Sequence, residues 1–264
     1  MTDFADLLKA DNDQSAHAIH LVDAEGLNNW LSRQPEQNRA IVAAQKFQGR
    51  AHEFAILPGE KPADWSVVAG VAKVDSLGPW CLAKLAEALP EGPYRLIDSS
   101  PGAAALGWLT AQYRFDRYRK DEQPAGPRIL LSRDAGRIDS TVRLAEAVAL
   151  VRDLVNTPAA DMGPPDLEAA TTGLATAFGA QVTVTRSVEL EQGYPMLHAV
   201  GKAADRGFAP RLIELQWGDP QHPRVAIIGK GICFDSGGLD IKPSAGMRLM
   251  KKDMGGAAHA LALA

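Results

Sequence analysis

Two lysines and two aspartates lie within a glycine-rich stretch of the 264-residue chain: Lys230, Asp235, Lys242 and Asp253. Carboxylate oxygens bind hard and borderline divalent cations, and an ammonium group stabilises negative charge on a reacting oxygen. A lysine can also bind a cation through its amine, but only as the neutral base. This combination of residues indicates a site that handles metal ions and a polar scissile bond.

Phosphate binding is a second chemistry that a glycine-rich turn after an apolar run can serve. The Walker pattern needs Gly-x-x-x-x-Gly-Lys-Ser/Thr, and the dinucleotide fingerprint needs Gly-x-Gly-x-x-Gly at the start of a helix. The segment Gly229–Phe234 fits neither pattern. A zincin is excluded as well, because the chain contains no His-Glu-x-x-His. The carboxylates therefore carry the stronger indication.

Each candidate residue also has an ordinary structural explanation when it is taken alone. Aspartate is common in turns and at helix N-caps, and a methionine such as Met250 can simply belong to the core. We expect Asp240 to be an exposed loop acid and His259 to be a helix residue. We expect Cys233 to be a small buried residue, because its neighbours are apolar and no histidine is near it in sequence. The functional interpretation therefore depends on the residues occurring together.

Several motifs occur in a fixed order near the site: Arg152-Asp-Leu-Val-Asn-Thr-Pro-Ala159, Gly229-Lys-Gly-Ile-Cys-Phe-Asp-Ser-Gly-Gly238, Ile241-Lys-Pro-Ser244 and Met250-Lys-Lys-Asp-Met-Gly-Gly-Ala-Ala258. In order and spacing they resemble the leucyl aminopeptidase family of two-metal exopeptidases, peptidase family M17. The resemblance covers roughly residues 140–264. Residues 1–120 match only loosely, as an α/β N-terminal domain that varies across the family.

The resemblance implies a role for each residue. Lys230 would bind one metal through its amine, Asp235 would bridge both metals, and Asp253 would bind the tighter one. Lys242 matches the catalytic lysine, which polarises the scissile carbonyl, and Met250 matches a residue of the apolar pocket for the N-terminal side chain. The implied activity is the release of N-terminal, leucine-like amino acids from peptides by a homohexamer.

The implied cofactors are two divalent metal ions, Mn²⁺ or Zn²⁺, with Mg²⁺ as a further candidate. The family's second signature, Asn-Thr-Asp-Ala-Glu-Gly-Arg, adds two carboxylates and an arginine that holds a bicarbonate base, and residues 1–264 lack it. We therefore expect the chain to carry about half of the site and to be inactive on its own. A non-catalytic interaction or scaffold protein that keeps the aminopeptidase fold is the alternative.

Composition indicates an ordinary globular protein, with 46% hydrophobic and 23% charged residues. A net charge of −4 gives nucleic-acid binding no support. Two unrelated cysteines, an acidic N-terminus and apolar runs too short to span a membrane make the cytoplasm the expected location.

Strands alternating with helices predict an α/β fold, with an N-terminal α/β domain at residues 1–137 and the opening of an α/β/α layered catalytic domain at 138–264. The polar segment 120–128 is the expected connection. The expected strands are Ala16–Val22, Val67–Val74, Tyr94–Ile97, Ile129–Leu131, Gln181–Thr185, Met196–Val200, Arg211–Trp217 and Arg224–Ile228. The expected helices are Ala24–Ser32, Pro79–Leu89, Ala103–Arg119, Ser140–Asn156, Pro165–Phe178, Val188–Gln192 and Ala257–Ala264.

The last expected strand has a special place in this scheme. Val225–Ile228 is apolar without alternation, as is typical of a central strand covered on both faces. Ligand sites of such sheets gather at the carboxyl ends of the strands, and the turn Gly229–Gly231 follows directly.

Overall fold

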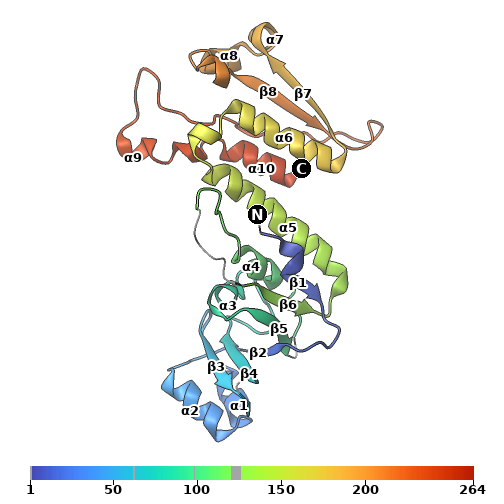
Figure 1. Ribbon diagram of the computed structural model, residues 1–264, viewed down its shortest axis with the longest axis vertical. Coiled ribbons are helices and arrows are strands. Elements are labelled where there is room, and N and C mark those ends of the chain that lie inside the picture. Colours follow the sequence, from blue (N-terminus) through green and yellow to red (C-terminus); the bar gives the residue numbers. More distant parts are fainter. Residues whose placement is uncertain (1, 62, 98, 120–125) are drawn as a thin grey trace. The chain divides into compact units, whose positions relative to one another are not determined.

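The computed structural model describes residues 2–61, 63–97, 99–119 and 126–264 (Figure 1). The chain divides into two compact units, Met1–Ala149 and Leu150–Ala264. This division falls inside helix α5 (Ile138–Asn156), whereas the expected domain boundary lies at the start of that helix and stays a prediction. The expected connection at 120–128 lies mostly outside the described residues.

The first unit is built on a six-stranded sheet in the order β1-β6-β5-β2-β4-β3. Neighbouring strands run parallel, except that β3 at one edge is antiparallel to β4. This parallel-rich sheet confirms the expected α/β fold class. The strands are β1 (Leu8–Ala10), β2 (His17–Val22), β3 (Phe54–Pro58), β4 (Trp65–Gly70), β5 (Gly92–Ile97) and β6 (Arg128–Ser132).

Helices cover both faces of this sheet. Val67 and Ala69 of β4 belong to one hydrophobic cluster and Val68 to another, because successive strand side chains point to opposite faces. The first cluster also contains side chains of α3 and α4, and the second contains side chains of α1 and α2. These helices are α1 (Leu27–Ser32), α2 (Glu36–Ala44), α3 (Ala83–Ala88) and α4 (Ala104–Thr110).

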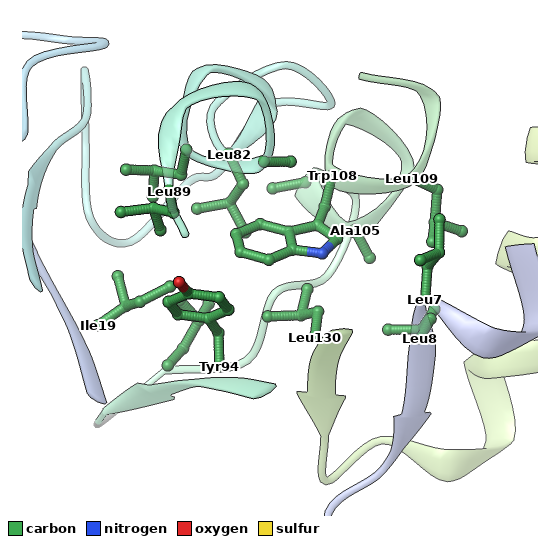
Figure 2. Close-up of a cluster of buried hydrophobic side chains, with 14 of the residues drawn as sticks. Leu7, Leu8, Ile19, Leu82, Leu89, Tyr94, Ala105, Trp108, Leu109 and Leu130 are labelled. Carbon is green, nitrogen blue, oxygen red and sulfur yellow. The ribbon is translucent and has the colours of Figure 1, made fainter. Parts of the chain in front are cut away.

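Trp108 of α4 lies at the centre of the larger cluster (Figure 2). The side chain is fully buried, and its ring centroid is 5.5 Å from that of Tyr94 on β5. The indole N–H donates a hydrogen bond to the carbonyl of Arg128 at 2.8 Å. Burial also raises the pKa of Tyr94 to about 12, and its hydroxyl donates to the carbonyl of Pro90 at 2.6 Å. These contacts fasten α4 to β5 and β6.

An ion pair joins the end of β1 to β5. The side chain of Asp11 is 1% exposed, and its two oxygens accept hydrogen bonds from Arg95 at 2.6 and 2.7 Å. The hydrogen bond from Arg95 lowers the pKa of Asp11 below its ordinary value, although burial acts in the opposite direction. The pair therefore contributes stability above about pH 4, and the contribution is lost as the pH falls through the lowered pKa.

We expect Asp11→Asn to lower the free energy of unfolding by about 2 kcal/mol at pH 7, because it leaves the partly buried guanidinium of Arg95 without its anion. The difference should shrink at about pH 3, below the ordinary pKa of aspartate, because Asp11 is then mostly protonated in the unfolded chain. Urea denaturation at the two pH values measures both quantities. An equal loss of unfolding free energy at the two pH values would contradict the assignment of Asp11 as the charged partner of Arg95.

The second unit contains a two-stranded antiparallel sheet, β7 (Gln181–Arg186) with β8 (Arg211–Gln216). Helix α6 (Pro164–Phe178) contacts both strands, and Glu168 on it pairs with an arginine of each strand. The remaining helices are α7 (Ser187–Gly193), α8 (Pro195–Gly201), α9 (Ser244–Met247) and α10 (Gly255–Leu263). Short 3₁₀ turns lie at Phe4–Asp6 and Ala135–Arg137 in the first unit, and at Ala159–Asp161, Arg206–Phe208 and Met250–Lys252 in the second.

A hydrophobic cluster joins the end of α5 to α6 and α10. Its buried members are Leu154, Met162, Leu167, Met254 and Ala258.

No helix in the part of the chain that the structure describes has both the length and the apolar character of a membrane span.

Two expected strands of this unit are wrong. Met196–Val200 lies in helix α8, which starts at Pro195, where the fixed φ of proline suits the first helical turn. Arg224–Ile228 forms no strand, and Val225 and Ile228 are 86% and 93% exposed. A central strand needs a neighbour on each side to take its backbone hydrogen bonds. The described residues of this unit place only β7 and β8 in a sheet, and those two pair with each other.

Two expected elements of the first unit end earlier than predicted. The helix expected over Ala103–Arg119 stops at Thr110, and the side chain of Gln112 turns instead to hydrogen-bond both backbone groups of Arg128. The strand expected over Val67–Val74 stops at Gly70, after which the chain leaves the sheet. The helix end is accompanied by hydrogen bonds between residues far apart in the sequence, and the local sequence pattern does not indicate such bonds.

Candidate metal centre

A tight loop brings Asp235 and Lys242 together. Gly237 and Gly238 have φ angles of 96° and 67°, a left-handed conformation that glycine adopts without steric cost. The N–H of Gly237 donates to Asp235 Oδ1 at 2.8 Å, and the backbone N–H of Lys242 donates to the carbonyl of Ser236 at 3.0 Å. The loop thereby closes on itself and places Lys242 Nζ 2.9 Å from Asp235 Oδ2.

Lys230 and Asp253 form the second pair of the site. Lys230 Nζ lies 2.7 Å from Asp253 Oδ1 and 2.8 Å from the backbone carbonyl oxygen of the same residue. Asp253 follows the 3₁₀ turn Met250–Lys252 and precedes α10, close to the helix start that the sequence indicates. Its side chain is 20% exposed, whereas that of Lys230 is 53% exposed.

Two glycines hold the backbone of Lys230 against the start of α10. A Cβ on Gly229 would lie 2.5 Å from the Cα of Ala257, and a Cβ on Gly256 would lie 2.9 Å from the nitrogen of Lys230. This close approach allows the N–H of Ala257 to donate to the carbonyl of Lys230 at 2.9 Å. Only glycine fits at the first of these positions, because its neighbours there are backbone atoms that cannot move aside singly.

We expect Gly229→Ala to lower the free energy of unfolding of the second unit by about 1–3 kcal/mol, the usual cost of forcing an extra carbon into a packed contact. Gly255→Ala is the matched control, because nothing lies within 4 Å of a Cβ at that helical position. It should be neutral or slightly stabilising, since alanine favours helix. Hydrogen exchange of the Ala257 amide reports the change, and equal behaviour of the two variants would contradict the close contact.

The two ion pairs influence each other electrostatically. The hydrogen bond from Lys242 lowers the pKa of Asp235, with a further contribution from the N–H of Gly237 and a smaller one from the charge of Lys230. The same contact with Asp235 raises the pKa of Lys242, and the charge of Asp253 adds to that effect. Lys242 is therefore protonated at neutral pH, as a residue that stabilises a developing oxyanion must be.

The donor atoms suit a divalent cation. Asp253 Oδ2 is buried and has no hydrogen-bond partner among the described residues, although leaving such an oxygen unpaired is costly. Together with Asp235 and the Lys230 amine it offers two carboxylates and one nitrogen, ligand types that Mn²⁺ and Zn²⁺ accept. Within the described ranges, no three His, Cys, Asp or Glu side chains are grouped around one point. The types of residue present thus suit a divalent metal ion, with two carboxylates as the acidic ligands.

The other residues singled out in the sequence take ordinary places. Cys233 is buried as expected, and this burial raises the pKa of its thiol to about 11, which leaves it a poor nucleophile. His259 lies in α10 and its Nδ1 is 2.7 Å from the carbonyl oxygen of Gly255. Asp240 is exposed in its loop, also as expected. Met250 is half-buried in the 3₁₀ turn, so its assignment to the substrate pocket stays a prediction.

The sequence alone assigns no role to three residues of the arrangement. Gly256 makes the close backbone contact with Lys230, Met254 is fully buried in the cluster beside Asp253, and Lys251 donates to the carbonyl of Asn156 at 3.1 Å. The run of small residues Gly255–Ala258 was a signal for the first, because small residues permit close approach. A contact between residues 95 positions apart, such as that of Lys251, leaves no local signal.

Two family models match successive parts of the chain. Residues 149–264 match the catalytic domain of the cytosol aminopeptidase family, and residues 18–131 match the N-terminal domain of M17 aminopeptidases. The two matches occur in the order of the family's domains and together span most of the chain. The chain belongs to the cytosol aminopeptidase family, M17.

Curated members of the M17 family are similar to it over long stretches. A probable cytosol aminopeptidase of Methylorubrum extorquens is 35% identical over 260 residues, which covers 84% of this chain and 50% of the relative. One from Rhodococcus jostii is 37% identical over 177 residues, covering 61% of this chain and 35% of the relative. The chain therefore spans between about a third and half of the length of the curated relatives it matches.

Solved structures of M17 proteins share the fold. The cytosol aminopeptidase of Coxiella burnetii superposes with a TM-score of 0.86 at 36% identity, over 97% of this chain and 56% of that chain. The bottromycin maturation enzyme BotP in complex with Mn gives a TM-score of 0.72 at 27% identity, over 98% of this chain and 55% of its own. These likenesses confirm that the α/β arrangement is that of M17 aminopeptidases.

Proposed function

We propose that this chain supplies the N-terminal domain and the first part of the catalytic site of a metal-dependent aminopeptidase. The enzyme would release N-terminal amino acids, apolar and leucine-like ones among them, from peptides. The observation that supports this most is the assembly of Lys230, Asp235, Lys242 and Asp253 in two interacting ion pairs, with one carboxylate oxygen of Asp253 buried and without a partner. Family membership supports the same reaction.

Asp235 and Asp253 would be the carboxylate ligands of two divalent cations, Mn²⁺ or Zn²⁺. Lys230 would contribute its amine, which must be neutral to bind a cation. Bound metal would polarise the scissile carbonyl and lower the pKa of a water molecule so that it can attack. Each aspartate forms an ion pair with a lysine, so each carboxylate already lies beside a positive charge, as it would beside a bound cation.

Lys242 would act on the substrate directly. Its ammonium sits on a loop whose geometry is set by two hydrogen bonds, so it is held without help from a substrate. A fixed positive charge near the scissile carbonyl stabilises the negative charge that develops on that oxygen, which is an effect of several kcal/mol in comparable sites, or about a hundredfold or more in rate. Met250, half-buried beside the site, would line the pocket for the first side chain.

Assembly as a homohexamer and a cytoplasmic location complete the proposal and rest on the family resemblance. They matter for the test, because the active species is then the assembled native polypeptide that contains this chain.

Hydrolysis of leucine amide by that native polypeptide tests the proposal. We expect leucine release in the presence of Mn²⁺, loss of activity with a chelator, and recovery when Mn²⁺ is restored. Lys242→Met should reduce kcat by at least about a hundredfold. A polypeptide that is folded and binds Mn²⁺ but hydrolyses neither leucine amide nor other aminoacyl amides would contradict the enzymatic proposal and favour the scaffold alternative.

A further inference from the structure

The end of helix α5 is close to the site in space although it is far away in sequence. The helix ends at Asn156, and Thr157 and Pro158 follow. A proline cannot continue the backbone ladder and pushes the residue before it out of the helical conformation. Thr157 closes the last turn, because its N–H and its hydroxyl both donate to the carbonyl of Asp153, at 3.0 and 2.6 Å.

The carbonyl of Asn156 accepts a hydrogen bond from a lysine ammonium. Lys251 Nζ lies 3.1 Å from this oxygen, in a partly buried environment. Helices cannot supply partners for their own last carbonyls, and a cation there also interacts favourably with the helix dipole. Lys251 therefore caps α5 from a segment 95 residues further along the chain.

The capping lysine sits in the 3₁₀ turn that leads to Asp253. Within that turn the N–H of Asp253 donates to the carbonyl of Met250 at 3.0 Å. Met254, on the other side of Asp253, is fully buried in the cluster that includes Leu154 of α5. The backbone of Asp253 is thus attached to the end of α5 on both sides, by a charged hydrogen bond before it and by apolar packing after it.

We propose that Lys251 is a positioning residue for Asp253. Its tether to α5 fixes the 3₁₀ turn, so that the Asp253 carboxylate faces Lys230 in the orientation that a cation would need. The role of Asp253 as a metal ligand rests on the proposed function, whereas the tether itself does not. Among the described residues, the Lys251 ammonium hydrogen-bonds Asn156 and neither Lys230 nor Asp253, so its effect on Asp253 would pass through the backbone between residues 251 and 253.

Three variants separate this role from a general effect of charge. Lys251→Met keeps the length of the side chain and removes the ammonium, and Lys251→Arg restores a charged donor. Lys252→Met is the matched control, because Lys252 is the adjacent lysine and its side chain is exposed. Hydrogen exchange of the intact chain is measured at the Asp253 and Thr157 amides. The Ala180 amide is the reference, because it donates a hydrogen bond to the carbonyl of Ala175 in α6, at 2.8 Å.

We expect Lys251→Met to speed exchange at both the Asp253 and Thr157 amides by about tenfold, the loss of one charge-assisted hydrogen bond, while Ala180 is unchanged. Lys251→Arg should restore most of the protection, and Lys252→Met should behave like the unaltered chain. Unchanged exchange at Asp253 in Lys251→Met would overturn the proposal. So would equal acceleration at Ala180, because it would show a general loss of stability.

Mn²⁺ binding, followed by the electron paramagnetic resonance signal of free Mn²⁺, separates the two proposals. In the native polypeptide, Lys251→Met should weaken Mn²⁺ binding by about tenfold, within the range seen for residues that orient a ligand, and Lys251→Arg should recover it. If the unaltered protein bound no Mn²⁺ while the exchange pattern appeared as expected, the proposed metal function would fail and the tether would stand. Unaltered Mn²⁺ affinity in Lys251→Met would overturn the positioning role.

Discussion

Asp253→Asn should weaken Mn²⁺ binding to the native polypeptide by at least about a hundredfold. This loss of affinity is larger than the loss expected when a residue that only orients a metal ligand is replaced. The substitution keeps the size and shape of the side chain and removes its negative charge. The buried Oδ2, which has no hydrogen-bond partner among the described residues, would be replaced by an amide group or by a neutral carbonyl oxygen. Isothermal titration with MnCl₂ measures the change directly.

Asp240→Asn is the matched control for this substitution. Asp240 belongs to the same glycine-rich loop and carries the same charge, but it is exposed. Among the causes that act on the pKa of Lys242, the charge of Asp240 is the smallest. We therefore expect Mn²⁺ affinity to change less than about threefold, as for an exposed charge screened by solvent. Equal losses in the two variants would mean that binding follows net charge and not the geometry around Asp253.

Trp108→Ala should lower the free energy of unfolding of the first unit by about 3–5 kcal/mol, the usual cost of deleting a large buried aromatic side chain. Trp108 has no exposed surface and contacts the ring of Tyr94 (Figure 2). Its removal also leaves the carbonyl of Arg128 without the indole donor. Since domains of this size are stable by only about 5–15 kcal/mol, the variant should be close to unfolding at 37 °C.

Trp80→Ala provides the comparison, because Trp80 is 54% exposed. Surface substitutions of this kind usually stay within about 0.5 kcal/mol. Urea denaturation followed by circular dichroism compares the two variants at the same pH. If Trp108→Ala cost no more than Trp80→Ala, the packing of α4 on β5 and β6 would be wrong.

The helices that the sequence predicts well have both a clear period and clear ends. Helix α6 was expected from Pro165 to Phe178 and runs from Pro164 to Phe178. A proline marks its first turn, and Gly179, with φ of 67°, takes the left-handed position that ends it. These signals are local, so the sequence alone suffices to read them.

Short apolar runs were the least reliable guide. Val225–Ile228 suggests a buried central strand and Met196–Val200 a strand, yet the first is irregular and exposed and the second is helical. Runs of this length cannot distinguish a strand from a helix segment, and they say nothing of whether a neighbouring strand is present. The sequence pattern predicts neither strands β1 and β3 nor helices α2 and α9. For α2 the reason is a narrow apolar face, since only Val42 of this helix is buried.

For the candidate site too, the sequence predicts one part and not the other. The motifs indicated which residues belong to it, because residue type and spacing are properties of the sequence. The pairing of Lys230 with Asp253, and of Lys242 with Asp235, was not predicted, because it depends on the close backbone contact at Gly229 and on the left-handed turn at Gly237. Both pairings are three-dimensional consequences of small residues, whose effect on the fold is not local.

Anomalous diffraction from crystals of this chain grown with MnCl₂ tests the central claim most directly. We expect a manganese peak within coordination distance, about 2–2.3 Å, of a carboxylate oxygen of Asp253 or Asp235, with Asp253 Oδ2 as the first candidate. Lys230 should then have exchanged its ion pair for a place beside the metal. A well-ordered site with both lysine–aspartate pairs intact, and manganese absent or bound elsewhere, would contradict the claim that these residues form part of a metal centre.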